Sequence, residues 1–308
     1  MIGVRPDDLA AITIKALVER AGIDPNTIED VVLGCAYPEA EQGSNIARLA
    51  LLLAVLPVET GGVTMNRFCG SSMSAIHYAV GQIAVAAGDA FIAGGVESMT
   101  RVPQGGFNHS PNLRFKGPKD APPDAMIEAY ISMGETAENV ARQYNISRAD
   151  QERLAWASQM KAAEAQRAGR LKDEIVRVKT QDGWIEVDGA LRPQTTLEGL
   201  AALKPAFRPD GSVAAGTSSP LTDGAAATLI TSEVYAKANR LDVLGRIRSV
   251  AVAGVPPEIM GMGPVPATLK ALARAGLTIN DIDVVEINEA FGSQAVACIR
   301  ELGIPMKK

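Results

Sequence analysis

The sequence predicts an α/β protein in which helices cover a parallel sheet. Three observations support this prediction. Short apolar runs alternate with helical patterns over residues 1–100, and a Pro- and Gly-rich block interrupts that alternation after residue 101. A helix–turn–strand pattern near the N-terminus also occurs again near the C-terminus. With 308 residues, of which 47% are apolar and 21% charged, the chain is long enough for two domains or one large layered domain.

The first part of the chain alternates helices with short apolar strands. Residues 7–21 place apolar side chains three and four positions apart, begin with Asp7 and Asp8 and stop at Gly22, which is typical of a capped amphipathic helix. An apolar run at 31–34 then predicts a buried strand. The alternation continues with a helix at 44–55, a strand at 62–68, a helix at 71–87 and a strand at 90–96.

The block from about 101 to 215 differs in composition from what precedes it. It opens with Pro and Gly and with three basic residues, Arg114, Lys116 and Lys119, and two helices follow. The second helix begins with a capping-box pattern from Ser147 to Asp150 and runs to about residue 168. Because α/β character returns at 225–231, the block is predicted to be an insertion.

An internal repeat links the two ends of the sequence. Residues 15–32 resemble residues 270–285, and each segment reads as a helix, a Gly stop, an acidic turn and a Val-Val strand. The matching turn residues favour a true duplication. The second copy reaches the end of the sequence before the strand and Cys-Gly-led helix that follow the first copy, so we expect a sequence that is cut short.

Charge and composition argue against several classes of protein. The formal net charge of −5 is against a general nucleic-acid or anionic-membrane binder, and no apolar run reaches membrane-spanning length. The N-terminus has no signal-peptide core. Three widely spaced cysteines and two histidines form neither a disulfide framework nor a zinc pattern. We therefore predict a cytoplasmic protein with no metal, no nucleic-acid partner and no membrane.

Cys69 is the strongest candidate for a catalytic residue. It stands where an apolar strand ends and a Gly-Ser-Ser-led helix begins, and the free N–H groups and dipole of a helix N-terminus stabilise a thiolate. The alternative is a buried structural cysteine. His77 follows two turns along the same helix, about 12 Å away by helical rise, which is too far for a base. His109 lies in a Pro/Gly loop, so a cysteine hydrolase is a poor alternative.

Other motifs hold polar or small residues where predicted strands end or begin. Asn288 and Glu289, with Phe291 beside them, can hold a water or polarise a carbonyl. The alternative, which does not exclude this, is that Asn288 caps a helix with Glu289 in its first turn. The small-residue loop at 216–227 lets a ligand lie against backbone, or is simply a tight connection. Met133 lies at the start of a predicted helix, and a methionine in such a position more often fills the core than binds a ligand. The glycines of 94–99 suggest close packing.

Together these motifs resemble the thiolase family over essentially the whole chain. RFCGSSM, GGVESM, the MG-TAENVA helix, TTLEGLAALKPAF, AGTSSPLTDGAA, GPVPA and NEAF occur in that family's order. The resemblance implies a thiolase-like five-layer αβαβα fold of two related halves with an inserted loop domain. The N-terminal half would comprise residues 1–100 and 216–243, and the C-terminal half, which would be incomplete, residues 244–308. The loop domain would comprise residues 101–215.

The resemblance also implies the chemistry. Cys69 would take an acyl group from an acyl-CoA and pass it to CoA or to acetyl-CoA, while Asn288 would hold a water in the oxyanion hole. Coenzyme A and acyl-CoA would be substrates, with no permanently bound cofactor. The resemblance would also place Ser219, Met133 and Phe291 along the pantetheine channel, Leu221 among the CoA contacts and Arg192 near the nucleotide. From the basic residues themselves, and not from the resemblance, we infer that the cluster at 114–119 is a weaker phosphate contact.

The sequence also departs from the family pattern. The family's first strand with its ARTP-like segment, the GHP histidine and the second catalytic cysteine have no counterpart in it. We expect this sequence to be part of an active thiolase, either a 3-ketoacyl-CoA thiolase or an acetyl-CoA C-acetyltransferase. The RFCGSSM and GTSSPLTDGAA motifs slightly favour the fatty-acid-degrading type. The alternative is a catalytically inactive, truncated homologue that binds CoA or serves as a scaffold. Members of the family form homodimers or homotetramers.

Overall fold

The computed structural model describes residues 1–112, 115 and 129–305 and divides the chain into two compact units. The first unit comprises Met1–His109, Glu174–Asp188 and Leu221–Ile247. The second unit comprises Ser110–Asp173, Gly189–Pro220 and Arg248–Lys308. The three-part domain division predicted from the sequence stays a prediction. The basic cluster at 114–119 lies outside the described residues.

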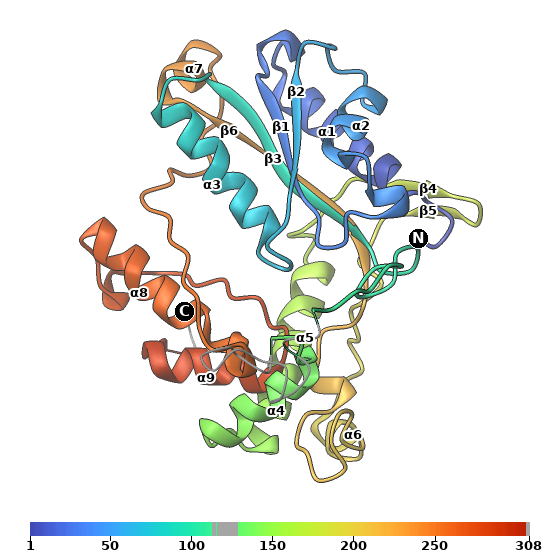
Figure 1. Cartoon of the computed structure of the whole chain (residues 1–308), viewed down its shortest axis with the longest axis vertical. Coiled ribbons are helices and arrows are strands. Elements are labelled where there is room, and N and C mark those ends of the chain that lie inside the picture. The colour runs from blue at the N-terminus through green and yellow to red at the C-terminus, as the bar shows by residue number, and fades with distance from the viewer. Residues whose placement is uncertain (113–114, 116–128, 306–308) are drawn as a thin grey trace. The chain divides into compact units, whose positions relative to one another are not determined.

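The first unit is built on a four-stranded sheet with the order β2-β1-β3-β6 (Figure 1). The strands are β1 (Asp30–Gly34), β2 (Gly61–Met65), β3 (Ala90–Ser98) and β6 (Asp223–Thr231). β1 runs parallel to both of its neighbours, which confirms the predicted parallel arrangement for the first part of the chain. β6 pairs with β3 antiparallel.

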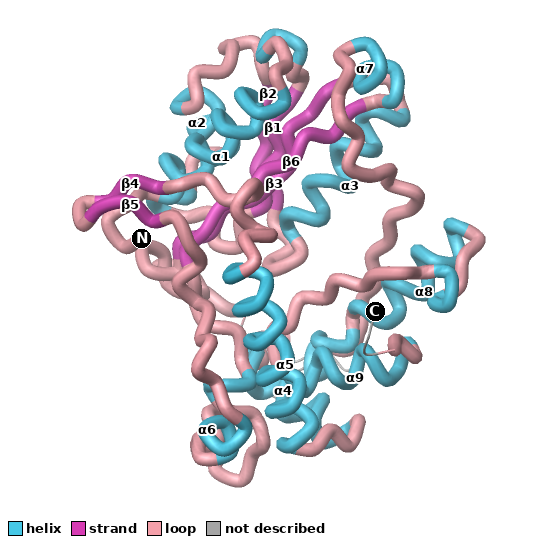
Figure 2. The backbone as a smooth tube through the Cα atoms, turned by 180° about the vertical axis from the view of Figure 1, so that it is seen from behind, coloured by secondary structure: helices cyan, strands magenta, loops and turns pink. Residues whose placement is uncertain are grey.

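Helices cover both faces of this sheet, as the alternation of buried side chains requires. Val31 and Leu33 of β1 face the core made with α1 (Pro6–Ala21) and α2 (Ile46–Leu53). Val32, between them, faces α3 (Ser71–Ala84) on the other side. Figure 1 shows α3 across the sheet from α1 and α2, and the view from behind in Figure 2 agrees. The unit also holds α7 (Glu233–Ala238) and a hairpin of β4 (Val178–Thr180) and β5 (Gly183–Ile185).

Helices make up the regular structure described in the second unit. They are α4 (Met133–Gln143), α5 (Arg148–Arg167), α6 (Leu197–Ala201), α8 (Pro264–Ala275) and α9 (Gly292–Leu302). A buried cluster joins α4, α5 and α9 through side chains that include Val140, Leu154 and Ala295. The predicted capping box of α5 is confirmed, because the Ser147 hydroxyl accepts from Asp150 N and the Asp150 carboxylate accepts from Ser147 N. Short 3-10 turns lie at Pro25–Thr27, Ala40–Gln42, Ala215–Thr217, Pro257–Met262 and Ile279–Asp281.

The two copies of the internal repeat share their local geometry. α1 and α8 both end at a left-handed glycine, Gly22 (φ 62°) and Gly276 (φ 69°), and a 3-10 turn follows each. The copies then differ. The first continues into β1, whereas the predicted second strand is wrong, since residues 282–290 are irregular and Val284 is 78% exposed. No strand is described within the second unit, so these residues have no neighbouring strand there with which to form backbone hydrogen bonds.

Two predicted boundaries move by a few residues for local reasons. The predicted strand at 62–68 ends at Met65 because the next residues form a turn. The predicted helix at 44–55 begins at Ile46, since Ser44 and Asn45 have left-handed backbone angles. Within residues 1–112, 115 and 129–305, no helix is both long enough and apolar enough to cross a bilayer.

Candidate active site

Cys69 lies in the turn that connects β2 to α3, with its side chain exposed. Gly70 is the N-cap of α3, and Ser71 is its first residue. The sulfur therefore belongs to the segment that leads directly into a helix N-terminus, where unpaired N–H groups favour negative charge. Exposure rules out the alternative of a buried structural cysteine. Cys35 and Cys298 are the buried cysteines of the chain.

The turn that carries Cys69 is strained and held by local hydrogen bonds. Phe68 has a φ of 46°, a left-handed angle that side-chain-bearing residues adopt only when the surroundings enforce it. Phe68 N donates to Asn66 Oδ1 at 2.8 Å. Ser71 Oγ accepts from Arg67 N at 2.7 Å and donates to Phe68 O at 2.6 Å. These bonds fix the backbone on both sides of the sulfur-bearing residue.

Two glycines of adjacent strands let the start of α3 rest directly on the sheet. Gly34 of β1 and Gly95 of β3 are paired in register. A Cβ on Gly34 would lie 2.5 Å from the backbone carbon of Ser71, and one on Gly95 would lie 2.1 Å from Ser72 Oγ. Gly34 must therefore be glycine for the helix to approach so closely, because its contacts are with backbone, whereas Gly95 faces a serine hydroxyl. The close packing predicted for residues 94–99 is confirmed.

Two ionisable side chains near this turn have shifted pKa values. Burial, and then the charge of Arg67, lower the pKa of His77, which lies in α3 as predicted. Burial raises the pKa of Tyr37, and a charge on Cys69 raises it further. Tyr37 therefore lies close enough to Cys69 to sense its charge, and its ring packs against Phe68 with centroids 6.1 Å apart. The sequence alone did not identify Tyr37.

The second unit brings together two motifs that lie far apart in the sequence. Ser219 N donates to Ala290 O at 2.9 Å, and Ser218 pairs with Phe291 as an isolated β-bridge. The small-residue loop is thus hydrogen-bonded to the NEAF segment. Phe291 is also the N-cap of α9, so the alternative in which Asn288 caps this helix is wrong. Phe291 itself is extended (φ −144°, ψ 144°), and the helix begins at the next residue, Gly292.

Aromatic packing connects Phe291 to the start of α4. The rings of Phe207 and Phe291 meet edge to face, with centroids 5.9 Å apart. A Cβ on Gly134 would lie 2.1 Å from the Phe207 ring, so this ring rests on the backbone next to Met133. Met133 is half-buried. Phe207 was not predicted, although an aromatic residue closing the predicted 195–207 motif was a usable signal.

The remaining predicted positions are exposed. Leu221, in the first unit, is 66% exposed, and Asn288, Ser219 and Arg192 in the second unit are exposed as well. Arg192 N donates to Gln159 Oε1 at 2.7 Å, which ties its loop to α5. Of the predicted set, Cys69 and Leu221 belong to the first unit and the other five to the second.

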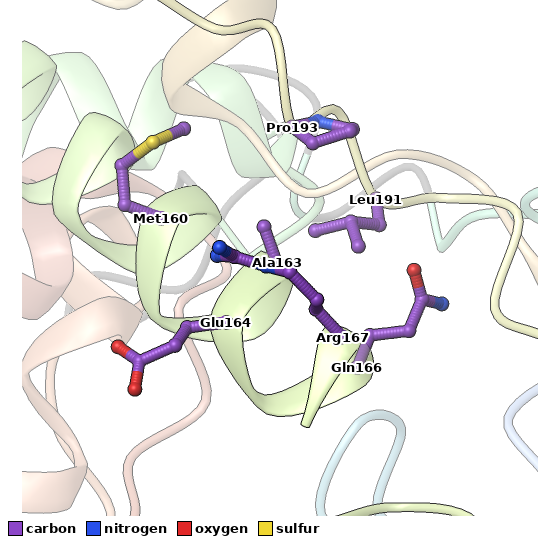
Figure 3. A pocket seen from close by; sticks show the side chains of 7 residues that line it. All are labelled: Met160, Ala163, Glu164, Gln166, Arg167, Leu191 and Pro193. Atoms are coloured by element: carbon purple, nitrogen blue, oxygen red, sulfur yellow. The ribbon is translucent and has the colours of Figure 1, made fainter. Parts of the chain in front are cut away.

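A hollow of about 620 Å³ lies next to Arg192 within the second unit. α5 and the loop on either side of Arg192 line it, and Figure 3 shows the side chains from both. Its wall is mixed in character, with apolar and charged groups side by side. The lining residues are Met160, Ala163, Glu164, Gln166, Arg167, Leu191 and Pro193.

Comparison with known families identifies the chain. A family model described as the thiolase N-terminal domain matches residues 2–234, and one described as the thiolase C-terminal domain matches residues 241–308. The chain belongs to the thiolase family. The predicted family and its α/β fold are confirmed, and so is the predicted class of enzyme, an acyltransferase of the thiolase type.

Curated relatives of this thiolase-family chain are similar along nearly its whole length. A 3-ketoacyl-CoA thiolase of Bacillus subtilis (strain 168) is 47% identical over 318 residues, which cover 99% of this chain and 80% of the relative. One of Shewanella loihica (strain ATCC BAA-1088 / PV-4) is 48% identical, with 98% and 78% covered. A beta-ketoadipyl-CoA thiolase of Escherichia coli is 46% identical, with 98% and 79% covered.

Proposed function

We propose that this chain transfers acyl groups between 3-ketoacyl-CoA and coenzyme A through a thioester on Cys69. The observation that carries the proposal is the exposed cysteine at the left-handed turn before α3, inside the segment matched by the thiolase N-terminal family model. The names of the relatives, 3-ketoacyl-CoA thiolase and beta-ketoadipyl-CoA thiolase, support 3-ketoacyl-CoA thioesters as the substrate class.

The proposed reaction has two balanced steps. The Cys69 thiolate attacks the 3-keto carbon, the bond between C2 and C3 breaks, and C2 leaves as the enolate of acetyl-CoA and takes a proton. The thiolate of a second CoA then attacks the acyl-Cys69 thioester, which releases a shortened acyl-CoA and regenerates the Cys69 thiolate. In reverse, the enolate of acetyl-CoA attacks the acyl thioester and forms the 3-ketoacyl-CoA. Asn288 would hold the water that stabilises the developing oxyanion.

The second unit is proposed to bind the CoA part of the substrate. Ser219, Met133 and Phe291 would contact pantetheine, and their support is the packing of Phe291 against Phe207, which rests beside Met133. Leu221, which is exposed, is proposed as a further CoA-contacting residue. The nucleotide end would lie near Arg192, beside the hollow whose lining includes Arg167, a candidate phosphate contact, together with Glu164 and apolar side chains.

Mass spectrometry of the intact protein tests the catalytic part of this proposal. Incubation with acetoacetyl-CoA should add one acetyl group, peptide mapping should place it on Cys69, and Cys69→Ser should abolish the adduct. Cys298→Ser is the matched control, because Cys298 is buried in the second unit and its replacement should leave the adduct unchanged. A wild-type protein that binds CoA without forming an adduct would instead support the non-catalytic alternative, which the relatives' names do not favour.

The biological setting remains part of the proposal. We expect a homodimer or homotetramer in the cytoplasm that takes part in fatty acid metabolism, with no permanently bound cofactor. The supporting observations are the names of the relatives and the family match. Sedimentation equilibrium of the purified chain tests the assembly, and a monomer at micromolar concentration would contradict it.

A further inference from the structure

Glu97, at the end of β3, accepts hydrogen bonds from the neighbouring segment 35–37. Its carboxylate accepts from Ala36 N at 2.6 Å and from Tyr37 N at 3.3 Å. Gln42, which is fully buried, donates Nε2 to the same carboxylate at 2.8 Å and also to Tyr37 O. The Cys35 thiol lies 3.9 Å from Glu97 Oε1. One carboxylate thus organises the segment that continues β1.

Segment 35–37 in turn contacts the turn that carries Cys69 at two places. Asn66 Nδ2 donates to Ala36 O at 2.9 Å, and Asn66 Oδ1 is the acceptor for Phe68 N. The ring of Tyr37 packs against the ring of Phe68 with centroids 6.1 Å apart. A continuous set of contacts therefore runs from Glu97 through Ala36 and Tyr37 to the two residues that define the left-handed turn.

We infer that Glu97 is a positioning residue, which holds segment 35–37 against the Asn66–Cys69 turn and so fixes the direction of the Cys69 sulfur. The inference rests on the proposed function, in which Cys69 must meet a carbonyl carbon in one orientation. The left-handed angle of Phe68 is the reason that outside support is needed, because a turn with this φ relaxes when its surroundings permit. Misplacement of a reacting group by about 1 Å can slow a reaction ~100-fold.

Replacing Glu97 with glutamine tests this role with little change of shape. An ionised carboxylate is an acceptor only, whereas the amide of Glu97→Gln has a single oxygen and presents two N–H groups. It cannot accept from Ala36 N, Tyr37 N and Gln42 Nε2 together. Glu59→Gln is the matched control, since Glu59 is an exposed carboxylate in the same unit.

Two readouts together separate positioning from general stability. In E97Q, amide hydrogen exchange over residues 66–71 should become at least ~10-fold faster, and kcat for acyl transfer should fall ~10- to 100-fold with KM changed less than ~3-fold. Iodoacetamide should label Cys35 faster than in the wild type, while Cys298 stays protected. Alkylation of Cys69, which needs no fixed orientation, should change less than ~3-fold.

The outcomes distinguish this inference from the function on which it rests. A wild-type protein that forms no acyl-Cys69 refutes the proposed function, and the exchange of residues 66–71 in E97Q still decides whether Glu97 holds the turn. Unchanged exchange and unchanged kcat in E97Q would overturn the inference. An equal rise in the iodoacetamide labelling of Cys35 and Cys298 in E97Q would also overturn the inference, because it would show that Glu97 supports the stability of the whole protein. Tyr37→Leu, which removes the ring contact with Phe68 and leaves Glu97 in place, should reproduce the fall in kcat.

Discussion

Replacement of Gly34 by alanine should displace the start of α3 from the sheet. A Cβ at this position would lie 2.5 Å from the backbone carbon of Ser71 and 2.5 Å from Ser72 N. Carbon atoms pack at about 3.5–4.0 Å, so the helix start must retreat by about 1 Å. The contacts are with backbone rather than with a flexible side chain, and the strain cannot be relieved by a rotamer change.

The expected loss of stability follows from two opposing effects. Overpacking of this kind typically costs about 1–3 kcal/mol, and replacement of a strand glycine by alanine returns roughly 0.5–1 kcal/mol through backbone entropy. The net loss should be about 1–2 kcal/mol in the free energy of unfolding of the first unit. Because Cys69 lies two residues before Ser71, a shift of about 1 Å should also slow acyl transfer by up to ~100-fold.

Native-state hydrogen exchange of the β3 amides measures the free energy of unfolding of the first unit. The rate of acyl-Cys69 formation measures the slowing of acyl transfer. Gly81→Ala is the matched control in α3 itself. A Cβ at Gly81 meets no atom within 4 Å, so this variant should gain roughly 0.5–1 kcal/mol from helix propensity. A Gly34→Ala protein that is as stable as the wild type and forms the acyl enzyme at the same rate would refute the packing argument.

Three further predictions concern a helix cap, a histidine and an aromatic contact. Ser147→Ala should destabilise the second unit by about 1 kcal/mol in urea unfolding, because Ser147 caps α5. The Ser147 hydroxyl, helped by Arg300, lowers the pKa of Asp150 to about 2 from 3.8, so its stabilising contribution is present above pH 4 and is lost as the pH falls through about 2. Asp150→Asn should therefore flatten the unfolding free energy over pH 2–4, and an unchanged slope would contradict this. Burial lowers the pKa of His77 below 6.5, so the first unit should lose stability as the pH falls through 6.5, where the unfolded chain takes up the proton. His77→Gln should remove this loss and leave acyl-Cys69 formation within ~3-fold of the wild type, since His77 is no base for the cysteine. Phe207→Ala should cost about 1–2 kcal/mol by removing the edge-to-face contact with Phe291, and a thermal shift below 1 °C would count against that packing.

The sequence supported the local elements well because their signals are local. The Gly stops after α1 and α8, the capping box of α5 and the apolar runs of β1 and β3 each encode their own backbone geometry. The candidate nucleophile could also be predicted, since a cysteine between an apolar strand and a Gly-Ser-Ser helix start is a local pattern. Its exposed position in the β2–α3 turn agrees with that prediction.

The Val-Val run of the second repeat shows the limit of this reasoning. Val31 and Val32 are fully buried between β2 and β3, whereas Val284 is 78% exposed. The residues have the same β propensity, but a strand is stabilised by the hydrogen bonds of its neighbours. A strand prediction from one segment therefore depends on partners that the segment itself does not contain.

The sequence by itself determined the family, the α/β class and the repeat, and it predicted Cys69 as the candidate nucleophile, because each depends on residue types in a fixed order along the chain. The tertiary structure alone decided which distant residues contact the turn that carries Cys69. Glu97 binds segment 35–37, that segment contacts Asn66 and Phe68, and Gly34 admits the start of α3. These contacts depend on the register of three parallel strands, and register is set by pairing across the sheet rather than by any one stretch of sequence.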